Sequence, residues 1–280
     1  MPKLLDESQV AAFHHDGFVS PVPVLNQADA AAYRRRFEDY ERAHDGWYTL
    51  SKGQKIHLLQ TWVAELVRNV SVLDAVEDVL GPDVMCWGTS LFVKDARDPH
   101  YVSWHQDSTY WGLDKPDVVT AWVALSPATR ESGCMKMMPG SHTREQIPHR
   151  DTLAEHNLLT RGQEIAVEVD DSRAAYIELA PGEISLHNVR TVHASEPNRS
   201  DERRIGVAMR YIAPHVRQLN GERDSAMLVR GEDRFGNFVH EKAPRRDMDA
   251  DALAEHARIM QLRQDILYDG VAGKPAHIES

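Results

Sequence analysis

His105 and Asp107 stand two residues apart in the segment Trp104-His105-Gln106-Asp107, and this pair constrains the fold more than any other feature of the sequence. Side chains two residues apart leave the same face of a β-strand, whereas on a helix they diverge. An imidazole and a carboxylate on one face, completed by one distant histidine, form the two-histidine, one-carboxylate triad that holds Fe(II) and leaves its other coordination positions open. The pair therefore predicts a β-protein with a one-sided iron site.

The residues around this pair favour β-structure. Residues 89–94 precede it across a loop, and residues 101–104 lead directly into it. Downstream, residues 118–125 are rich in β-branched and aromatic side chains and lie between Pro116 and Pro127, which indicates a buried strand. An isolated H-x-D triplet is weak evidence in a chain with 15 histidines, so it is this context that favours an iron site over a surface or core histidine.

The segment 186–193 supplies the distal histidine of the expected triad. His187 and His193 both compete for this role. Residues six apart on an extended segment can share a face, so their spacing alone does not choose between them.

The strand expected after this segment adds a cationic group. Arg204, Gly206, Ala208 and Arg210 share one face of it. Arginine can bind a carboxylate through two parallel hydrogen bonds, so Arg204 beside small residues suits the remote carboxylate of a dicarboxylate cosubstrate. The alternative is that Arg203 and Arg204 form a solvated basic pair next to the acidic residues of the preceding loop.

Several longer segments resemble one family. They are WHQDSTYWGL, VVTAWVALSPATRESGCMKMMPGSH and LHNVRTVHASEPNRSDERRIGVAMRYI, with the weaker stretches KIHLLQTW and LGPD. Together they cover most of residues 8–240 and resemble the phytanoyl-CoA dioxygenase family of Fe(II)/2-oxoglutarate-dependent oxygenases, in its bacterial small-molecule hydroxylase branch.

The resemblance implies a set of site residues. The metal ligands would be His105, Asp107 and His193, and the 2-oxoglutarate arginine would be Arg204, eleven residues after His193. It also implies that Ser195 and Trp122 contact 2-oxoglutarate. His187 would then line the pocket, with a role as backup metal ligand as the less favoured alternative. Ala194 stands where the family usually has glycine. The implied cofactors are Fe(II), 2-oxoglutarate as cosubstrate, and O2.

The expected reaction is hydroxylation of a C–H bond in a small molecule such as an amino acid, an aminophosphonate or a secondary-metabolite scaffold. Related halogenases replace the carboxylate ligand with alanine or glycine, so Asp107 favours hydroxylation over halogenation. Two alternatives stay open. The same cofactors could direct desaturation, epimerisation or cyclisation, or the protein could be a cupin-like metal or small-ligand binding protein without oxygenase turnover.

Candidate substrate-binding residues lie in segments that would border the pocket; they are Trp111, Gln106, His187, Lys94, Lys55 and Tyr110. Trp111 matches a substrate-packing position of ectoine-hydroxylase-like relatives, with an ordinary core or rim tryptophan as the alternative. Lys55 and Lys94 could bind an anionic group, although a solvated surface position is the commoner place for a lysine.

Two further segments have less defined roles. The loop 141–156 holds His142, His149 and His156, whose irregular spacing favours a mobile lid or plain surface over a second metal site. Residues 224–231 look similar to a stretch in bacterial members of the family, and the sequence offers no physical account of them.

The order of the expected elements indicates the architecture. Helices are expected over residues 8–15, 29–43 and 62–80, short strands follow to about residue 213, and a last helix covers residues 249–267. With the resemblance, this predicts a mainly β fold, a double-stranded β-helix (jelly roll, cupin-like) with N-terminal and C-terminal helices packed against it. We expect one domain over residues 1–280, with helices about 8–80, the core about 84–213 and the extension about 249–267.

Composition narrows the partners. A formal charge of −11 and a pI near 5.7 argue against nucleic acid and against an anionic membrane surface, which leaves a small-molecule substrate. Cys86 and Cys134 form no zinc or disulfide pattern and are expected to be reduced and buried. Without a signal sequence or a membrane-length apolar run, the expected location is cytoplasmic.

Overall fold

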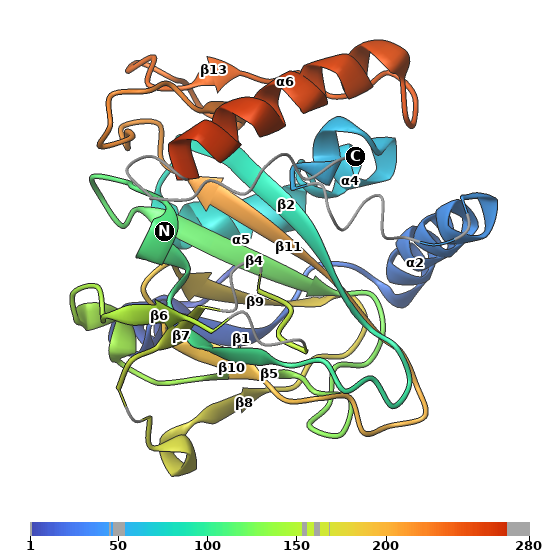
Figure 1. The fold of residues 1–280 in the computed structure, drawn as a ribbon, viewed down its shortest axis with the longest axis vertical. Helices are drawn as coiled ribbons and strands as arrows, with labels where there is room; N and C mark the ends of the chain where they lie inside the picture. The colour runs from blue at the N-terminus through green and yellow to red at the C-terminus, as the bar shows by residue number, and fades with distance from the viewer. Residues whose placement is uncertain are drawn as a thin grey trace.

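Two main β-sheets, a two-stranded β-hairpin and a set of flanking helices make up the described part of the fold (Figure 1). The computed structural model describes residues 2–44, 46, 54–152, 156–159, 163–167 and 169–267. The helices are α1 (Glu7–Asp16), α2 (Gln27–Ala43), η1 (Ile56–Leu58), α4 (Thr61–Leu66), α5 (Val70–Leu80), η2 (Asp107–Tyr110), η3 (Ser141–Thr143), η4 (Asp171–Arg173) and α6 (Ala250–Leu267). The strands are β1 (Phe18–Pro23), β2 (Val84–Lys94), β3 (Val102–His105), β4 (Val118–Ala124), β5 (Met135–Met137), β6 (His149–Asp151), β7 (Gln163–Ile165), β8 (Ala175–Ile177), β9 (Glu183–Asn188), β10 (His193–Ser195), β11 (Arg204–Ile212), β12 (Ser225–Arg230) and β13 (Val239–His240).

The strands are arranged as a large and a small sheet. Within the described residues, the large sheet has the order β1-β9-β4-β11-β2-β12-β13 and the small sheet the order β3-β10-β5-β8. The pair β6 and β7 forms a separate hairpin. Most neighbours in the two main sheets are not consecutive in the sequence, as β11 beside β2 and β10 beside β3 show, which is the connectivity of the predicted jelly roll.

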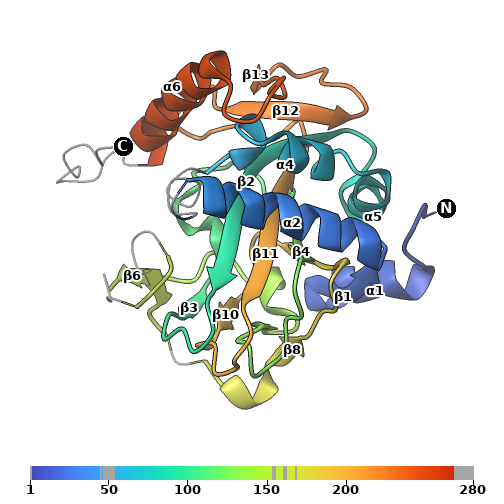
Figure 2. The same cartoon turned by 90° about the vertical axis from the view of Figure 1, so that its right-hand side faces the viewer.

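The two faces of β11 have different environments. Its odd-numbered residues pack with α2, α4 and α5 in the main hydrophobic core, and Figure 2 shows α2 lying across that face of the large sheet. Of its even-numbered residues, Arg204, Ala208 and Arg210 line the internal cavity, Gly206 lies on the same face, and Ile212 packs in a second hydrophobic cluster. The alternation of a β-strand therefore separates the core from the site.

Two expectations about the elements were wrong. The helix predicted over residues 62–80 is two helices, because the side chain of Asn69 accepts hydrogen bonds from the backbone N–H groups of Ser71 (3.0 Å) and Val72 (3.2 Å) and so caps a new helix. The strands also extend beyond residues 84–213, since β1 pairs with β9 and β12 pairs with β2.

The segment 224–231 now has a structural place. It forms β12 beside β2, and Asp224 just before the strand accepts a hydrogen bond from Trp87 Nε1 at 2.6 Å. No helix among the described residues has the length and apolar character needed to cross a membrane.

Candidate metal centre

His105, Asp107 and His193 meet where the small sheet borders the cavity. His105 is the last residue of β3 and His193 the first of β10, and the two are partners in the register of these strands. One ligand atom from each of the three side chains lies within 4.8 Å of the others, and His105 Nε2 is 3.6 Å from Asp107 Oδ1. This is the predicted one-sided donor set.

Asp107 reaches the site by a different route from the one expected. It does not continue the strand of His105 but begins the 3-10 helix η2. Gln106 between them keeps an extended backbone, with φ −110° and ψ 136°, so the alternation of side chains persists for the one step that matters. The H-x-D spacing therefore places the pair correctly although the strand ends at His105.

Backbone carbonyls fix the orientation of both histidines. His105 Nδ1 lies 2.9 Å from the carbonyl oxygen of Ser103 and 3.1 Å from that of His193, and His193 Nδ1 lies 2.9 Å from that of Thr191. A carbonyl oxygen only accepts, so each Nδ1 carries the proton and each Nε2 keeps its lone pair. Hydrogen bonds of this kind orient metal-ligating histidines, and the residues present fit a divalent cation.

The protonation states also suit a metal. Burial would raise the pKa of Asp107, but its neighbours His105, His193 and Arg210 bring it below its usual range. Burial, followed by the neighbouring His105, lowers the pKa of His193 well below its usual value. An ionised carboxylate and a neutral imidazole are the forms that bind a metal ion.

The structure separates the two competing histidines. His193 belongs to the donor set, whereas His187 comes from β9 in the large sheet, with its ring centroid 5.0 Å from that of His193. His187 lines the cavity, its Nδ1 is buried with no hydrogen-bond partner in the described residues, and burial lowers its pKa to about 4. It therefore forms part of the cavity wall, as expected.

Arg204, Ser195 and Trp122 line one corner of the same cavity. Arg204 is only 2% exposed, donates a hydrogen bond from Nη1 to the carbonyl oxygen of Gly133, and holds Cζ 5.5 Å from the Trp122 ring centroid. This places a buried cation in the wall of the cavity that the donor set also lines. The expected solvated pair is thereby excluded for Arg204, while Arg203 forms ion pairs with Glu41 and Asp95.

Lys94 joins this corner. It is the register partner of Arg204, and its Nζ donates to Ser195 Oγ at 2.8 Å. Burial and then the charge of Arg204 lower the pKa of Lys94 to about 6. Lys94 therefore lies with the expected cosubstrate residues and not in a separate substrate region.

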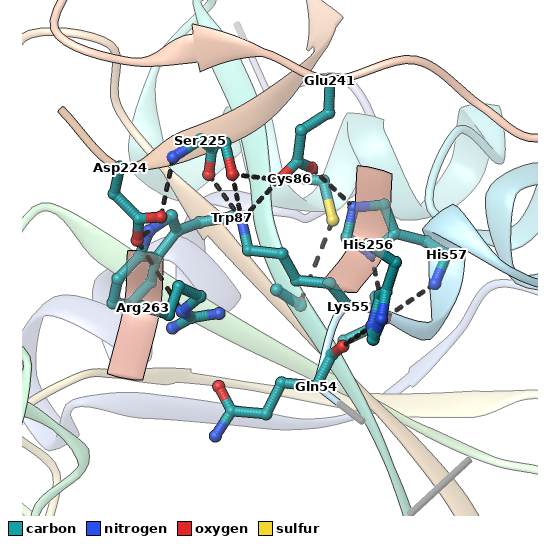
Figure 3. A network of polar contacts seen from close by, with 12 residues as sticks. Gln54, Lys55, His57, Cys86, Trp87, Asp224, Ser225, Glu241, His256 and Arg263 are labelled. Atoms are coloured by element: carbon teal, nitrogen blue, oxygen red, sulfur yellow. Dashed lines mark hydrogen bonds and ion pairs between the residues drawn. The ribbon is translucent and has the colours of Figure 1, made fainter. Parts of the chain in front are cut away.

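The other substrate candidates lie in different places. Gln106 is tied to the loop beyond β5, accepting from Ile147 N at 2.8 Å and donating to the Arg190 carbonyl at 2.8 Å. Lys55 is fully buried away from the cavity, where its Nζ pairs with Glu241 Oε1 at 2.5 Å (Figure 3). The side chain of Tyr110 lies outside the described residues.

The three histidines of the loop 141–156 do not come together. His142 Nε2 lies 3.2 Å from the carbonyl oxygen of His14, His149 Nε2 accepts from Gln106 N at 3.0 Å, and the His156 ring is 5.3 Å from that of His100. In the part of the chain that the structure describes, these contacts give no second metal site, and they place His149 against the segment that carries the triad.

Two cavity residues went unrecognised in the sequence. Thr120 Oγ1 donates to Asp107 Oδ2 at 3.5 Å, and Arg210 lines the cavity at the far end of β11 from Arg204. The sequence signal for Arg210 was its place on the same strand face as Arg204. Trp111 lies next to it, with the Arg210 Cζ 5.6 Å from the ring centroid.

Comparison with known proteins gives one family match and several relatives. The family described as Phytanoyl-CoA dioxygenase (PhyH) matches residues 13–206. The chain is 27% identical over 173 residues to a probable alpha-ketoglutarate-dependent hypophosphite dioxygenase of Stutzerimonas stutzeri, covering 61% of this chain and 60% of that protein. It is 26% identical over 140 residues to the L-proline trans-4-hydroxylase of Streptomyces griseoviridis, covering 46% of this chain and 52% of that protein. The matched region thus spans about half to three fifths of the length of these curated relatives.

Solved structures agree over nearly the whole chain. The apo structure of the non-heme monooxygenase ThoJ is 36% identical, has a TM-score of 0.83, and the match covers 93% of this chain and 98% of that one. CytC3 with Fe(II) and alpha-ketoglutarate is 23% identical with a TM-score of 0.64, over 89% of this chain and 97% of that one, a likeness that concerns the fold. The predicted fold is confirmed.

Proposed function

The chain belongs to the phytanoyl-CoA dioxygenase family, and on this premise we propose that it is an Fe(II)- and 2-oxoglutarate-dependent dioxygenase that hydroxylates a C–H bond of a small molecule. The substrate class is an amino acid, an aminophosphonate or a secondary-metabolite scaffold. Relatives named for hypophosphite, L-proline and ectoine support a small substrate.

One observation carries the proposal: the triad and Arg204 open into the same cavity. A site that only held a metal ion would not need a buried arginine with a free edge. Arg204 Nε is buried and has no hydrogen-bond partner among the described residues, so it is available to a ligand oxygen. Three protein donors and a separate carboxylate anchor are what Fe(II) and 2-oxoglutarate require together.

When bound, Fe(II) with 2-oxoglutarate and O2 supplies the oxidant by oxidative decarboxylation, which releases succinate and CO2. The protein's own residues position these groups. The metal would be held from one side by His105, Asp107 and His193. The remote carboxylate would be held by Arg204 and Ser195, and the ring of Trp122 would line the cosubstrate pocket. The buried walls keep bulk water away from the reacting centre.

The presence of Asp107 favours hydroxylation over halogenation, because its carboxylate occupies the position that a halide would take. Desaturation, epimerisation or cyclisation with the same cofactors, and metal binding without turnover, are the competing outcomes.

A turnover assay distinguishes these outcomes. The protein is incubated with Fe(II), 2-oxoglutarate and O2 and a panel of amino acids, aminophosphonates and hypophosphite. Succinate formation and the mass of each recovered compound are then measured. Asp107→Ala tests the triad, and Asp117→Ala is the matched control, because Asp117 is a partly exposed carboxylate whose Oδ2 pairs with His215 at 2.7 Å.

We expect wild type and Asp117→Ala to form succinate together with a product that has gained one oxygen atom, and Asp107→Ala to form neither. A product that has lost two hydrogen atoms would show that the reaction is desaturation and not hydroxylation. Bound Fe(II) without any consumption of 2-oxoglutarate or O2 across the panel would contradict the proposal.

A further inference from the structure

Arg210 lies beside the iron site, on the side away from the cosubstrate corner. It is six residues beyond Arg204 on the same face of β11, which at a rise of roughly 3.3 Å per residue separates the two backbone positions by ~20 Å. In the register of β11 and β4, Arg210 is opposite Thr120, the residue whose hydroxyl donates to Asp107. Both arginines line the cavity, which the donor set borders.

The guanidinium of Arg210 has unused hydrogen-bonding capacity. It carries five N–H donors. Nη1 donates to Ser90 Oγ at 3.1 Å, and Nε is buried without a partner in the described residues. The Trp111 ring covers one side of the group, at 5.6 Å from Cζ to the ring centroid. The group is therefore held in place by its surroundings, and its Nε is available to a ligand oxygen.

A second buried arginine approaches from the C-terminal helix α6. Arg263 is 4% exposed, its Nε lies 3.8 Å from Asp224 Oδ2, and its Cζ lies 4.7 Å from the Trp87 ring centroid. Figure 3 shows Arg263 beside Asp224 and Trp87. Its Nη1 is also buried with no partner among the described residues.

The two arginines converge over Gly88 of β2. A Cβ added at Gly88 would lie 3.4 Å from Arg263 Nη1 and 4.0 Å from Arg210 Cδ. The charge of Asp107 acts on Arg210, and Asp224 Oδ2 lies 3.8 Å from Arg263 Nε, but no carboxylate of the described residues accepts a hydrogen bond from Arg210 Nε. The two positive charges repel each other, so an anion bound to Arg210 would be stabilised by both of them.

We propose that Arg210, supported by the charge of Arg263, forms an anion-binding subsite that holds a carboxylate or a phosphorus oxyanion of the substrate while its C–H bond faces the metal. This rests on the proposed function and narrows its substrate class to compounds that carry an anionic group next to the reacting carbon chain. The edge-to-face pair of Trp87 and Trp111, with ring centroids 4.9 Å apart, supports Arg210 and Arg263 by contacts with their guanidinium groups.

Anion binding to the loaded protein tests the proposal. Acetate, methylphosphonate and neutral acetamide are titrated by calorimetry into the full chain with Fe(II) and 2-oxoglutarate under anaerobic conditions, and again into the metal-free protein. The variants are Arg210→Gln, Arg210→Lys and Arg263→Gln. Arg217→Gln is the matched control, because Arg217 is an exposed arginine whose Nε pairs with Asp114 at 3.0 Å.

We expect wild type and Arg217→Gln to bind at least one of the two anions but not acetamide. The anion that binds identifies the carboxylate or the phosphorus class. Arg210→Gln should weaken this binding about 10- to 100-fold, the worth of a charge-assisted hydrogen bond. Arg263→Gln should weaken it less, and the 2-oxoglutarate affinity of each variant should stay near that of wild type. If Arg210→Gln does not fold, Arg210→Lys keeps the charge without the planar fork and should still bind the anion more weakly than wild type.

Anion binding that is unchanged in Arg210→Gln, or equal binding of acetamide, would overturn the subsite. So would loss of 2-oxoglutarate binding in folded Arg210 variants, because Arg210 would then act at the metal or cosubstrate. The wild-type protein could fail to bind 2-oxoglutarate and still bind an anion in the metal-free state, with that binding weakened in Arg210→Gln. The proposed function would then be wrong, and the anion subsite would be supported.

Discussion

Gly206→Ala tests how closely the expected cosubstrate pocket is built. A Cβ added at Gly206 would lie 1.9 Å from Trp122 Cζ2 and 2.3 Å from Cη2, whereas ordinary van der Waals contact begins at 3.4 Å. The indole is large, only 4% exposed and held in the sheet. The Trp122 ring therefore has to move by about 1.5 Å, the difference between 3.4 and 1.9 Å. The space into which it can move is the cavity that it lines.

The magnitude follows from the cost of overpacking. Added methylene groups in a well-packed interior cost about 1–3 kcal/mol. For a chain of this size, each kcal/mol shifts the melting temperature by roughly 2–4 °C, so Gly206→Ala should melt about 2–12 °C below wild type. If the ring relieves the strain by entering the pocket, 2-oxoglutarate must restore it on binding. The same energy then weakens cosubstrate affinity by about 5- to 150-fold.

Thermal unfolding and an anaerobic 2-oxoglutarate titration of the Fe(II)-loaded protein measure both effects. The control is Gly88→Ala on the neighbouring strand, where the nearest atom to an added Cβ is 3.4 Å away. The control should change melting and 2-oxoglutarate affinity little. A Gly206→Ala protein with wild-type melting and wild-type affinity would refute the close packing of Trp122 on Gly206.

Two further predictions concern buried charges. Glu241→Gln leaves Lys55 buried without its ion-pair partner and should lower the free energy of unfolding, measured with urea, by about 3–5 kcal/mol; an unchanged value would contradict the pairing. Burial would raise the pKa of Glu241, but the charge of Lys55 lowers it from 4.5 to about 2. The ion pair therefore stabilises the wild-type protein fully above pH 4.5, and this stabilisation is lost as the pH falls toward 2. Glu241→Gln should show no such loss. Burial and the charge of Arg204 lower the pKa of Lys94 to about 6, and the negative charge of a bound remote carboxylate should raise it again. Lys94 should then take up a proton from solvent when 2-oxoglutarate binds above pH 6, so binding should weaken as the pH rises. Calorimetry in buffers of different ionisation enthalpy measures this uptake, which Lys94→Met should abolish; a wild type without uptake at pH 8 would refute it.

The central part of the site was predictable because it depends on local rules. The two-residue spacing of His105 and Asp107 needs only one extended residue between them, and Gln106 supplies it even though the strand ends early. The alternation of β11 likewise placed Arg204 on the cavity face. The choice of His193 over His187 needed the pairing of β10 with β3, which spacing alone does not contain.

The parts of the fold and the site that the sequence did not predict depend mostly on contacts between distant segments. Lys55 is buried because Glu241, far along the chain, pairs with it, and no local pattern announces that partner. Arg210 shares a predictable face with Arg204, but the anion subsite proposed for it also depends on Arg263, which helix α6 brings beside it. The two helices in place of one over residues 62–80 arise from a single capping residue within an apolar pattern that runs through both.

The most direct test of the account is the visible charge-transfer band of the Fe(II)–2-oxoglutarate chelate under anaerobic conditions. Wild type should give a saturable band on titration with 2-oxoglutarate. His193→Ala should lose it, His187→Ala should keep it, and Arg204→Ala should need far more cosubstrate to reach it. A wild type that binds Fe(II) without the band, or a band that His193→Ala retains and His187→Ala loses, would contradict the site described for this chain.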